Sequence, residues 1–143
     1  MSAQINVNFA VPNGKPIRPL HGVNSGPMTK VFTYDARPLF LEAGLPYARL
    51  HDVEYPYGSG EFVDIPCIFR NFDADETDPA NYNFGLTDEY LARCVEVGCE
   101  PFFRLGESIE HHYKYGTLPP KDNAKWARIC EHIIRHYNEG WAD

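Results

Sequence analysis

The sequence predicts an α/β fold in which βα units repeat around a parallel sheet. In the stretch 98–107, a Gly that ends a helical pattern is followed by an apolar strand and then by Glu107. A near copy at 44–52 again places an Arg-Leu pair before polar residues. Gly adopts the left-handed conformation that closes a helix, and a Pro shortly afterwards prevents the helix from continuing. Two such copies indicate that the βα unit is repeated.

The elements before residue 52 are predicted to be short. Apolar residues alternate with polar ones from Ile5 to Val11, which predicts a strand in an N-terminal β-ribbon over residues 1–20, outside the main body. Residues 20–24 predict a first inner strand, whose polar residues His21 and Asn24 are expected to face a pocket. A helix that begins near Pro38 and closes at Gly44 leads into a second inner strand over residues 47–51.

Two longer helices are predicted in the second half. Thr87 is expected to cap the first, Gly98 to end it, and Leu91, Cys94 and Val95 to form its buried stripe. After a strand over residues 101–105 comes the strongest helical pattern, which Gly140 stops and whose apolar positions are Trp126, Ile129, Cys130, Ile133, Ile134 and Tyr137.

The connection over residues 53–83 is too long for an ordinary loop, so we expect a functional loop or a subdomain there. It contains the acidic run from Asp73 to Asp78. This run lacks the Gly and the terminal Glu of a calcium-binding loop, so a solvated loop is the better interpretation.

Composition excludes several classes of partner. The chain has 143 residues and a formal net charge of −7, so a nucleic-acid backbone would be repelled. No apolar run approaches the roughly 18 residues that span a bilayer, and residues 1–4 lack a signal pattern, so we expect a soluble, cytoplasmic protein without a membrane partner. The four Cys residues show no Cys-x-x-Cys spacing, which predicts reduced core thiols. No phosphate-binding loop is present, so no cofactor is expected.

Three polar residues follow the predicted inner strands. His51 and Asp52 come after the second strand and Glu107 after the third. Ligands bind at the carboxyl ends of parallel strands, so these residues are candidate site residues, with loop or helix capping as the alternative. Asp52 with Glu107 or Glu110 would supply the two carboxylates that glycosidic bond cleavage needs, although any acidic protein offers such pairs.

Two other motifs are interpreted as surface features. His132 and His136 share one helical face but lack a further ligand at matching spacing, so no metal site is predicted and a solvated flank is expected. Asn138-Glu139 looks like the dipeptide in which many barrel glycosidases place their acid catalyst. It ends a helix just before Gly140, so we expect a solvated surface position.

Several segments together resemble glycoside hydrolase family 39, the β-xylosidase and α-L-iduronidase family. The similarity is carried in order by residues 21–27, 49–52, 82–84, 101–111 and 118–122 and the helix of Trp126. It implies a retaining (β/α)8 TIM barrel of which this chain holds the first three βα units, over residues 21–143, truncated before strand four. The family's acid/base and nucleophile Glu residues are then expected beyond Asp143, so no catalytic residue lies in this chain.

The resemblance implies a sugar contact for His51 and, by position, a place in the same pocket for His21 and Glu107. Asp52 and Tyr113 complete the predicted substrate-binding set. The implied function is that of the N-terminal part of a β-xylosidase-like retaining hydrolase, with a β-xyloside or related glycoside as partner.

Two other functions stay open. One is a non-catalytic carbohydrate-binding or assembly module formed by a partial barrel, and the other is a self-contained α/β domain with another small ligand. A complete barrel needs about 250 residues, so the chain is expected to self-associate or to pair with the missing remainder through its open edges.

Overall fold

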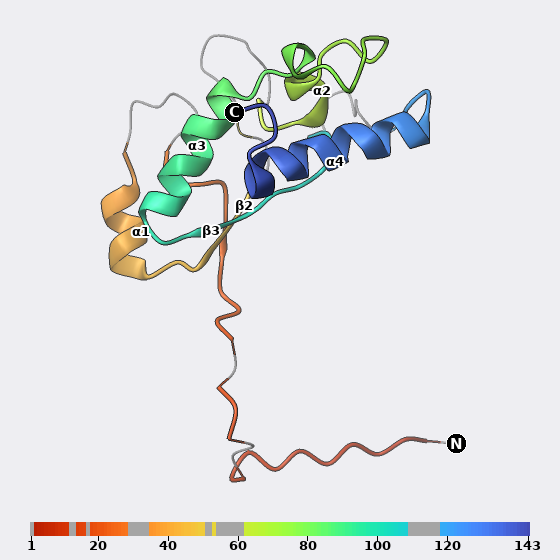
Figure 1. Ribbon diagram of the computed structural model, residues 1–143. Coiled ribbons are helices and arrows are strands. Elements are labelled where there is room, and N and C mark those ends of the chain that lie inside the picture. The colour runs from red at the N-terminus through yellow and green to blue at the C-terminus, as the bar shows by residue number, and fades with distance from the viewer. Residues whose placement is uncertain are drawn as a thin grey trace.

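The computed structural model describes residues 2–11, 14–16, 18–28, 35–50, 53, 62–108 and 118–143 (Figure 1). In this part of the chain, three strands form one sheet: β1 (Val23–Asn24), β2 (Tyr47–Arg49) and β3 (Glu100–Phe102). The helices are α1 (Arg37–Ala43), α2 (Ile65–Ile68), the 3-10 helix η1 (Pro79–Asn81), α3 (Gly85–Glu96) and α4 (Asn123–Glu139). The fold is therefore mixed α/β, with α1 between β1 and β2 and α3 between β2 and β3.

The sheet is parallel throughout, in the order β1-β2-β3. Ala48 of β2 lies opposite Val23 of β1 and opposite Pro101 of β3. The backbone N–H of Leu50 donates to the carbonyl oxygen of Phe102 at 3.1 Å, which continues the pairing beyond the strand ends. The predicted order of three strands with intervening helices is therefore confirmed.

Helix ends agree with the sequence signals at several positions. α1 ends at Gly44, whose φ is 58°, and α4 ends at Gly140, whose φ is 71°. At the start of α4, Asp122 Oδ1 accepts hydrogen bonds from the backbone N–H groups of Ala124 and Lys125. A carboxylate at this position satisfies N–H groups that have no partner within the helix.

One face of the sheet carries the main core. Ala48 and Leu50 are fully buried there, against Phe40 of α1 and Tyr90 and Cys94 of α3. A second core cluster joins α2 to α4, and its buried members include Ile65, Ile68, Phe84, Ile129 and Ile133. Phe103 and Tyr137 pack against both clusters, so the two cores are continuous.

The cysteines are free thiols, as predicted. Cys94, Cys99 and Cys130 are buried, and Cys67 is half-buried. Burial raises the pKa of the Cys94 thiol to about 12, because the charged thiolate would lose its hydration. These residues therefore act as small apolar core groups.

The predicted N-terminal strand is not formed in the described residues. Ile5 and Phe9 are 85% and 95% exposed, and the segment extends away from the sheet in Figure 1. Alternation of apolar residues supplies one face of a strand, but a strand also needs a neighbour for its backbone hydrogen bonds. No described strand pairs with this segment.

Two details of α3 differ from the prediction. The helix begins at Gly85, and Thr87 is buried inside its first turn instead of capping it. The Thr87 hydroxyl donates to the carbonyl oxygen of Phe62 at 2.9 Å, which fixes the helix to the preceding loop. Val95 is 65% exposed, so the buried stripe is narrower than the sequence pattern predicted.

The histidine pair on α4 is packed among aromatic side chains, contrary to the predicted solvated flank. His136 is buried and stacks on Phe84 at a centroid distance of 3.7 Å. Its Nδ1 lies 2.7 Å from the carbonyl oxygen of Trp141 and its Nε2 3.1 Å from Asp88. His132 is half-buried and stacks on Trp141. The sequence pattern did not predict this packing, because the aromatic partners come from other segments.

Asn138 and Glu139 are exposed, as predicted.

No helix within the described ranges is both long and apolar enough to cross a membrane.

Candidate functional site

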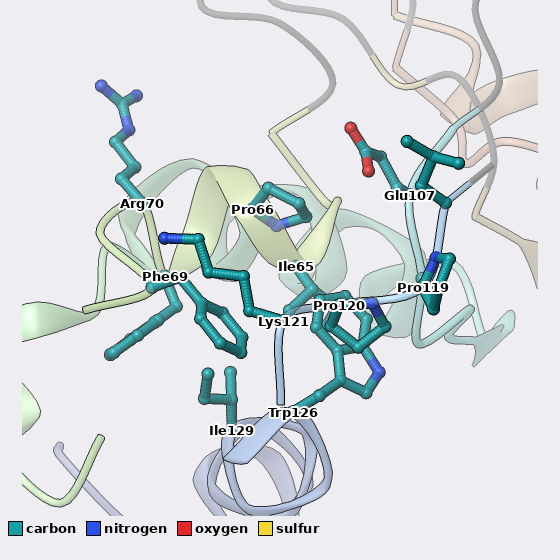
Figure 2. Close-up of a pocket in the computed structure, with 13 residues that line it drawn as sticks. Ile65, Pro66, Phe69, Arg70, Glu107, Pro119, Pro120, Lys121, Trp126 and Ile129 are labelled. Carbon is teal, nitrogen blue, oxygen red and sulfur yellow. The ribbon is translucent and has the colours of Figure 1, made fainter. Parts of the chain in front are cut away.

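A pocket of about 470 Å³ lies at the carboxyl end of β3 (Figure 2). Its walls come from α2, from the loop after β3, from the Pro-rich entry to α4 and from the first turns of α4. The lining residues are Ile65, Pro66, Phe69, Arg70, Phe72, Gly106, Glu107, Leu118, Pro119, Pro120, Lys121, Trp126 and Ile129. The volume falls within the range of about 300–1,000 Å³ that is usual for small-molecule sites.

The pocket combines an apolar wall with a charged rim. Trp126 and Phe69 supply aromatic rings, and Glu107, Arg70 and Lys121 are exposed charged residues. In Figure 2 the Glu107 carboxylate and the Arg70 guanidinium lie on opposite sides of the pocket. Aromatic surface with a few polar groups suits a ligand that has both an apolar face and hydroxyl groups.

A buried polar cluster fixes the loop that carries Glu107. Arg104 Nη1 donates to the backbone carbonyl oxygen of Glu107 at 2.7 Å. The Nη2 of the same guanidinium lies 3.1 Å from Asp64 Oδ1 and donates to Ser108 Oγ at 2.7 Å. The backbone N–H of Ser108 in turn donates to Asp64 Oδ2. The peptide group between Glu107 and Ser108 is therefore tied to one buried carboxylate, directly through its N–H and by way of Arg104 through its carbonyl.

Asp64 precedes α2 and connects this helix to the Glu107 loop. Its side chain is 4% exposed and makes no cap to α2, because its oxygens are taken by Arg104 and Ser108. The backbone N–H of Ile65 donates to the carbonyl oxygen of Gly106 at 3.0 Å. α2 and the Glu107 loop are thus joined by side-chain and backbone contacts, which hold two walls of the pocket together.

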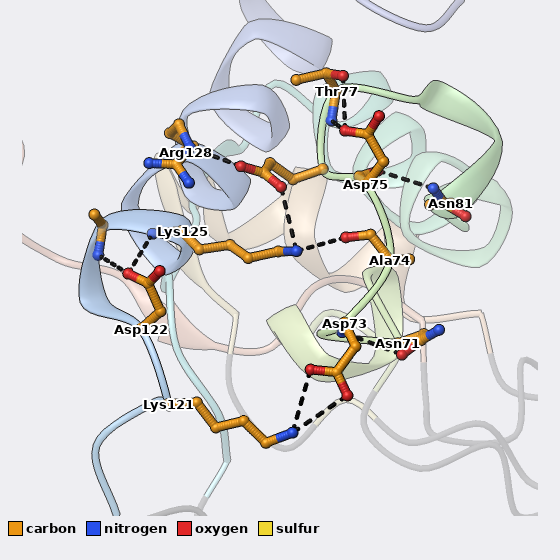
Figure 3. Close-up of polar contacts among 12 residues, drawn as sticks. Asn71, Asp73, Ala74, Asp75, Thr77, Asn81, Lys121, Asp122, Lys125 and Arg128 are labelled. Atoms are coloured by element: carbon orange, nitrogen blue, oxygen red, sulfur yellow. Dashed lines mark hydrogen bonds and ion pairs between the residues drawn. The ribbon is translucent and has the colours of Figure 1, made fainter.

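The acidic run packs against α4 (Figure 3). The Glu76 carboxylate, 13% exposed, accepts from Arg128 Nε at 2.7 Å and lies 3.3 Å from Lys125 Nζ. The hydrogen bond from Arg128 is the main cause that lowers the pKa of Glu76 from 4.5 to about 2. Asp75, Asp78 and Asp73 are exposed. The prediction of a solvated loop is therefore wrong for Glu76, because two basic side chains of α4 lie opposite it.

The same contacts support the pocket wall. Lys121 Nζ lies 3.3 Å from Asp73, and Lys125 Nζ donates to the carbonyl oxygen of Ala74 at 2.6 Å. The ammonium group of Lys125 also lies 5.7 Å from the ring centre of Phe72, a lining residue. The acidic loop therefore holds Phe72 and Lys121 beside the pocket.

The predicted site residues fall into two groups. His51, Asp52 and Tyr113 lie outside the described residues, so their roles stay predictions. His21 and Glu107 are described, and they line separate pockets.

His21 precedes β1, and its Nε2 is hydrogen bonded to the carbonyl oxygen of Gly44 at 3.2 Å. It shares a shallow pocket with Asn24, Tyr47, Arg49 and other residues. A residue before a strand lies at the amino edge of a parallel sheet, and Glu107 follows a strand at the carboxyl edge. Within the described residues, His21 and Glu107 therefore line separate pockets, and a common pocket for them stays a prediction.

The sequence pattern did not predict the clamp formed by Asp64, Arg104 and Ser108, nor that Trp126 lines the same pocket as Glu107. An Asp before Ile65-Pro66 signals a helix start, but this signal predicts a cap and not a distant ion pair. Trp126 was assigned to the core from its helical spacing, and it lines the pocket because the first turn of α4 lies at the edge of the core.

The described lining supplies one carboxylate, that of Glu107. Hydrolysis of a glycosidic bond by a retaining mechanism needs two. The described part of the pocket is therefore equipped to bind, with one carboxylate that accepts hydrogen bonds from hydroxyl groups. Nowhere in the described ranges do three His, Cys, Asp or Glu side chains gather as metal ligands.

The fold is similar to part of a known hydrolase. No family model matches the chain. The crystal structure of a glucosidase from Croceicoccus marinus matches it with a TM-score of 0.67 and 26% sequence identity, over 87% of this chain and 26% of the glucosidase chain. The chain therefore spans about a quarter of the length of this structural neighbour. The match supports a glycoside hydrolase-like origin for the chain.

Proposed function

We propose that this chain is the N-terminal part of a retaining, β-xylosidase-like glycoside hydrolase and that the pocket beside Glu107 contacts the sugar. The observation that carries the proposal is the position of Glu107, which lies at the carboxyl edge of a parallel sheet in a pocket that Trp126 and Phe69 line. The likeness to a glucosidase supports the general class, and the resemblance to glycoside hydrolase family 39 supports the finer one.

In this proposal Glu107 binds and does not react. Its carboxylate accepts hydrogen bonds from sugar hydroxyl groups, while the rings beside it cover the apolar face of the sugar. The clamp from Asp64 and Arg104 fixes the loop backbone, so that little conformational freedom is lost when the ligand binds. His51 is proposed as a second contact to the sugar. The protein is proposed to be cytoplasmic. The two reacting carboxylates belong to later strands of the full-length hydrolase.

The proposal is tested by titrating the chain with xylose, xylobiose and methyl β-xyloside and following amide shifts by NMR. Shifts should cluster at Glu107, Gly106 and Trp126. Glu107→Gln should weaken binding about tenfold or more, because a carboxylate is the stronger acceptor. Glu139→Gln is the matched control, since Glu139 is exposed at the far end of α4. Binding that is equal in the two variants would remove Glu107 from the site.

A hydrolysis assay separates binding from catalysis. The 143-residue chain should leave a chromogenic β-xyloside intact. Hydrolysis that Glu107→Gln abolishes and Glu139→Gln preserves would instead make Glu107 a catalyst. In a full-length hydrolase, unchanged sugar affinity after His51→Ala would refute the proposed contact of His51.

The second candidate function is an assembly module that binds sugar without cleaving it. The specific observation in its favour is the exposure of Phe102 on the sheet, which is 63%. This function predicts sugar binding together with a defined oligomer of the isolated chain.

A further inference from the structure

A buried histidine connects the end of α4 to the start of α3. The side chain of His136, in the last turn of α4, is 7% exposed. Its ring stacks on the ring of Phe84, the residue before α3, at a centroid distance of 3.7 Å. The residues after α4 also lie beside the start of α3 (Figure 1). The imidazole of His136 is therefore enclosed between α3, α4 and the segment that follows α4.

Both nitrogens of this ring face oxygen atoms that accept hydrogen bonds. Nδ1 lies 2.7 Å from the carbonyl oxygen of Trp141, and Nε2 lies 3.1 Å from Asp88 Oδ1. A second carboxylate, that of Asp143, lies 3.5 Å from Nδ1. A neutral imidazole carries one N–H and one lone pair, whereas an imidazolium carries two N–H groups. Hydrogen bonds to both acceptors therefore require the charged ring.

The charged groups around the ring favour this state. Asp88 lies in the first turn of α3, where the helix dipole stabilises a negative charge, and its side chain is 43% exposed. The Tyr137 hydroxyl donates to Asp88 Oδ1 at 3.0 Å, so this oxygen acts as an acceptor. On α4 itself, the cation of Arg135 is paired with Glu139 at 2.9 Å. A positive charge on His136 thus lies between carboxylates from α3 and from the segment after α4.

A second histidine on the same helix provides a contrast. His132 lies one turn earlier and stacks on Trp141 at a centroid distance of 4.4 Å. Its Nδ1 lies 3.2 Å from the hydroxyl oxygen of Tyr82, and that hydroxyl donates its proton to the carbonyl oxygen of Glu76. The hydroxyl oxygen can accept one N–H from a neutral ring. Within the described ranges His132 has no other hydrogen-bond partner, so its surroundings require one N–H and not two.

We propose that His136 is a proton-dependent latch between α4 and the start of α3. The carbonyl oxygen of Trp141 and the carboxylate of Asp143 keep a proton on Nδ1, so Nε2 can donate to Asp88 only when the ring carries a second proton. As pH rises, this proton leaves Nε2 for the solvent. The half-exposed Asp88 carboxylate then turns to water, and the contact between the two helices opens. The latch lies apart from the Glu107 pocket, whose lining does not include His136.

The test is NMR of the full chain with 15N-labelled histidine, which reports the state of each ring nitrogen. At pH 7 both nitrogens of His136 should carry a proton, and at pH 9 only Nδ1 should. His132 should lose its second proton at a lower pH than His136, because one N–H is enough for its partner. A neutral His136 ring at pH 7, or a titration of His136 that coincides with that of His132, would overturn the proposal.

Asp88→Asn tests the partner of Nε2. The amide has nearly the same size as the carboxylate and can donate an N–H to Nε2, so a neutral ring then makes both contacts. His136 should bind its second proton at least about tenfold more weakly in this variant. Glu89→Gln is the matched control, because it removes the next carboxylate of α3, which is exposed and lies 3.8 Å from Arg93. Equal proton binding in wild type and Asp88→Asn would show that Asp88 does not hold the latch.

The same contact should affect thermal stability. The stability that the second proton contributes is present at low pH and is lost as pH rises and Nε2 becomes deprotonated. Between pH 6 and pH 9 the melting temperature of the wild-type chain should therefore fall by at least about 2 °C more than that of Asp88→Asn. Identical pH profiles would contradict the latch. The NMR measurement on the wild-type chain decides the protonation state even if Asp88→Asn does not fold.

Discussion

The two faces of the β2 and β3 strands differ sharply although they belong to the same short segments. On the covered face, Ala48 and Leu50 are at most 1% exposed. On the opposite face, which no described helix covers, Phe102 is 63% exposed and Glu100 is also exposed. The difference shows that α1 and α3 determine which half of each strand becomes core. It also shows that strong apolar character does not by itself lead to burial.

The loop after β3 extends this comparison to polar groups. Its buried part contains the ion pair of Asp64 and Arg104, and its exposed part contains the Glu107 side chain. Packing fixes the ion pair, whereas the Glu107 side chain is exposed and lines the pocket. A rigid backbone under an open side chain is the arrangement that a binding residue requires.

The largest expected effect on stability comes from truncating a side chain on the covered face of the sheet. Leu50→Ala should lower the free energy of unfolding by about 2–5 kcal/mol, because it leaves a cavity in a fully buried site. Phe102→Ala should change it by no more than about 0.5 kcal/mol in the monomer, since that ring already contacts water. Urea denaturation monitored by circular dichroism measures both. Equal losses in the two variants would mean that the faces do not differ as described.

A smaller effect is expected at the buried polar cluster. Asp64→Ala should cost about 1–3 kcal/mol, because it leaves the Ser108 N–H without its acceptor and removes the carboxylate that pairs with Arg104 Nη2. The partial exposure of Arg104, 22%, limits this cost because water can reach the charge.

The local readout for Asp64 is hydrogen exchange at the Ser108 amide. Exchange should accelerate in Asp64→Ala, while amides in the middle of α4 keep the protection expected from the global stability. Asp64→Asn is the companion variant, since it keeps the size of the side chain and removes its charge. Unchanged exchange at Ser108 in both variants would contradict the proposed clamp of the Glu107 loop.

The smallest effect concerns the contact between Glu76 and α4 and depends on pH. The folded pKa of Glu76 lies below its ordinary value, so its contribution to stability is present above pH 4.5 and is lost as pH falls toward about 2. Glu76→Gln should therefore lower the melting temperature at neutral pH. It should also flatten the decrease in melting temperature across this acidic window.

The control for this pH dependence is Glu131→Gln, on an exposed position of the same helix. Its melting temperature should follow the wild-type profile. If Glu76→Gln also followed the wild-type profile at all pH values, the contact with Arg128 would contribute nothing to stability.

Local signals in the sequence were sufficient for much of the fold. Gly44 and Gly140 predicted where α1 and α4 end, and the repeated βα pattern predicted three parallel strands. Each of these features depends on residues close together in the chain. The position of Glu107 after the third strand was predicted for the same reason.

Contacts between distant segments were not predicted. Asp64 and Ser108 are 44 residues apart, and His136 binds Asp88 across 48 residues. A single sequence contains no spacing that joins such pairs, so His136 was assigned to solvent and Asp64 to no role. The sequence also did not predict that His21 and Glu107 line different pockets, because only the direction of the assembled strands distinguishes the two edges of the sheet.

The sequence by itself determined the order of the elements, the ends of the main helices and the placement of polar residues after strands, because these follow from backbone conformation and local periodicity. Only the tertiary structure decided which face of the sheet is covered, which carboxylate is buried and which aromatic rings line the Glu107 pocket. Side chains alternate between the two faces of a strand, and this alternation does not distinguish one face from the other. The helices that pack against one face determine which side chains are buried.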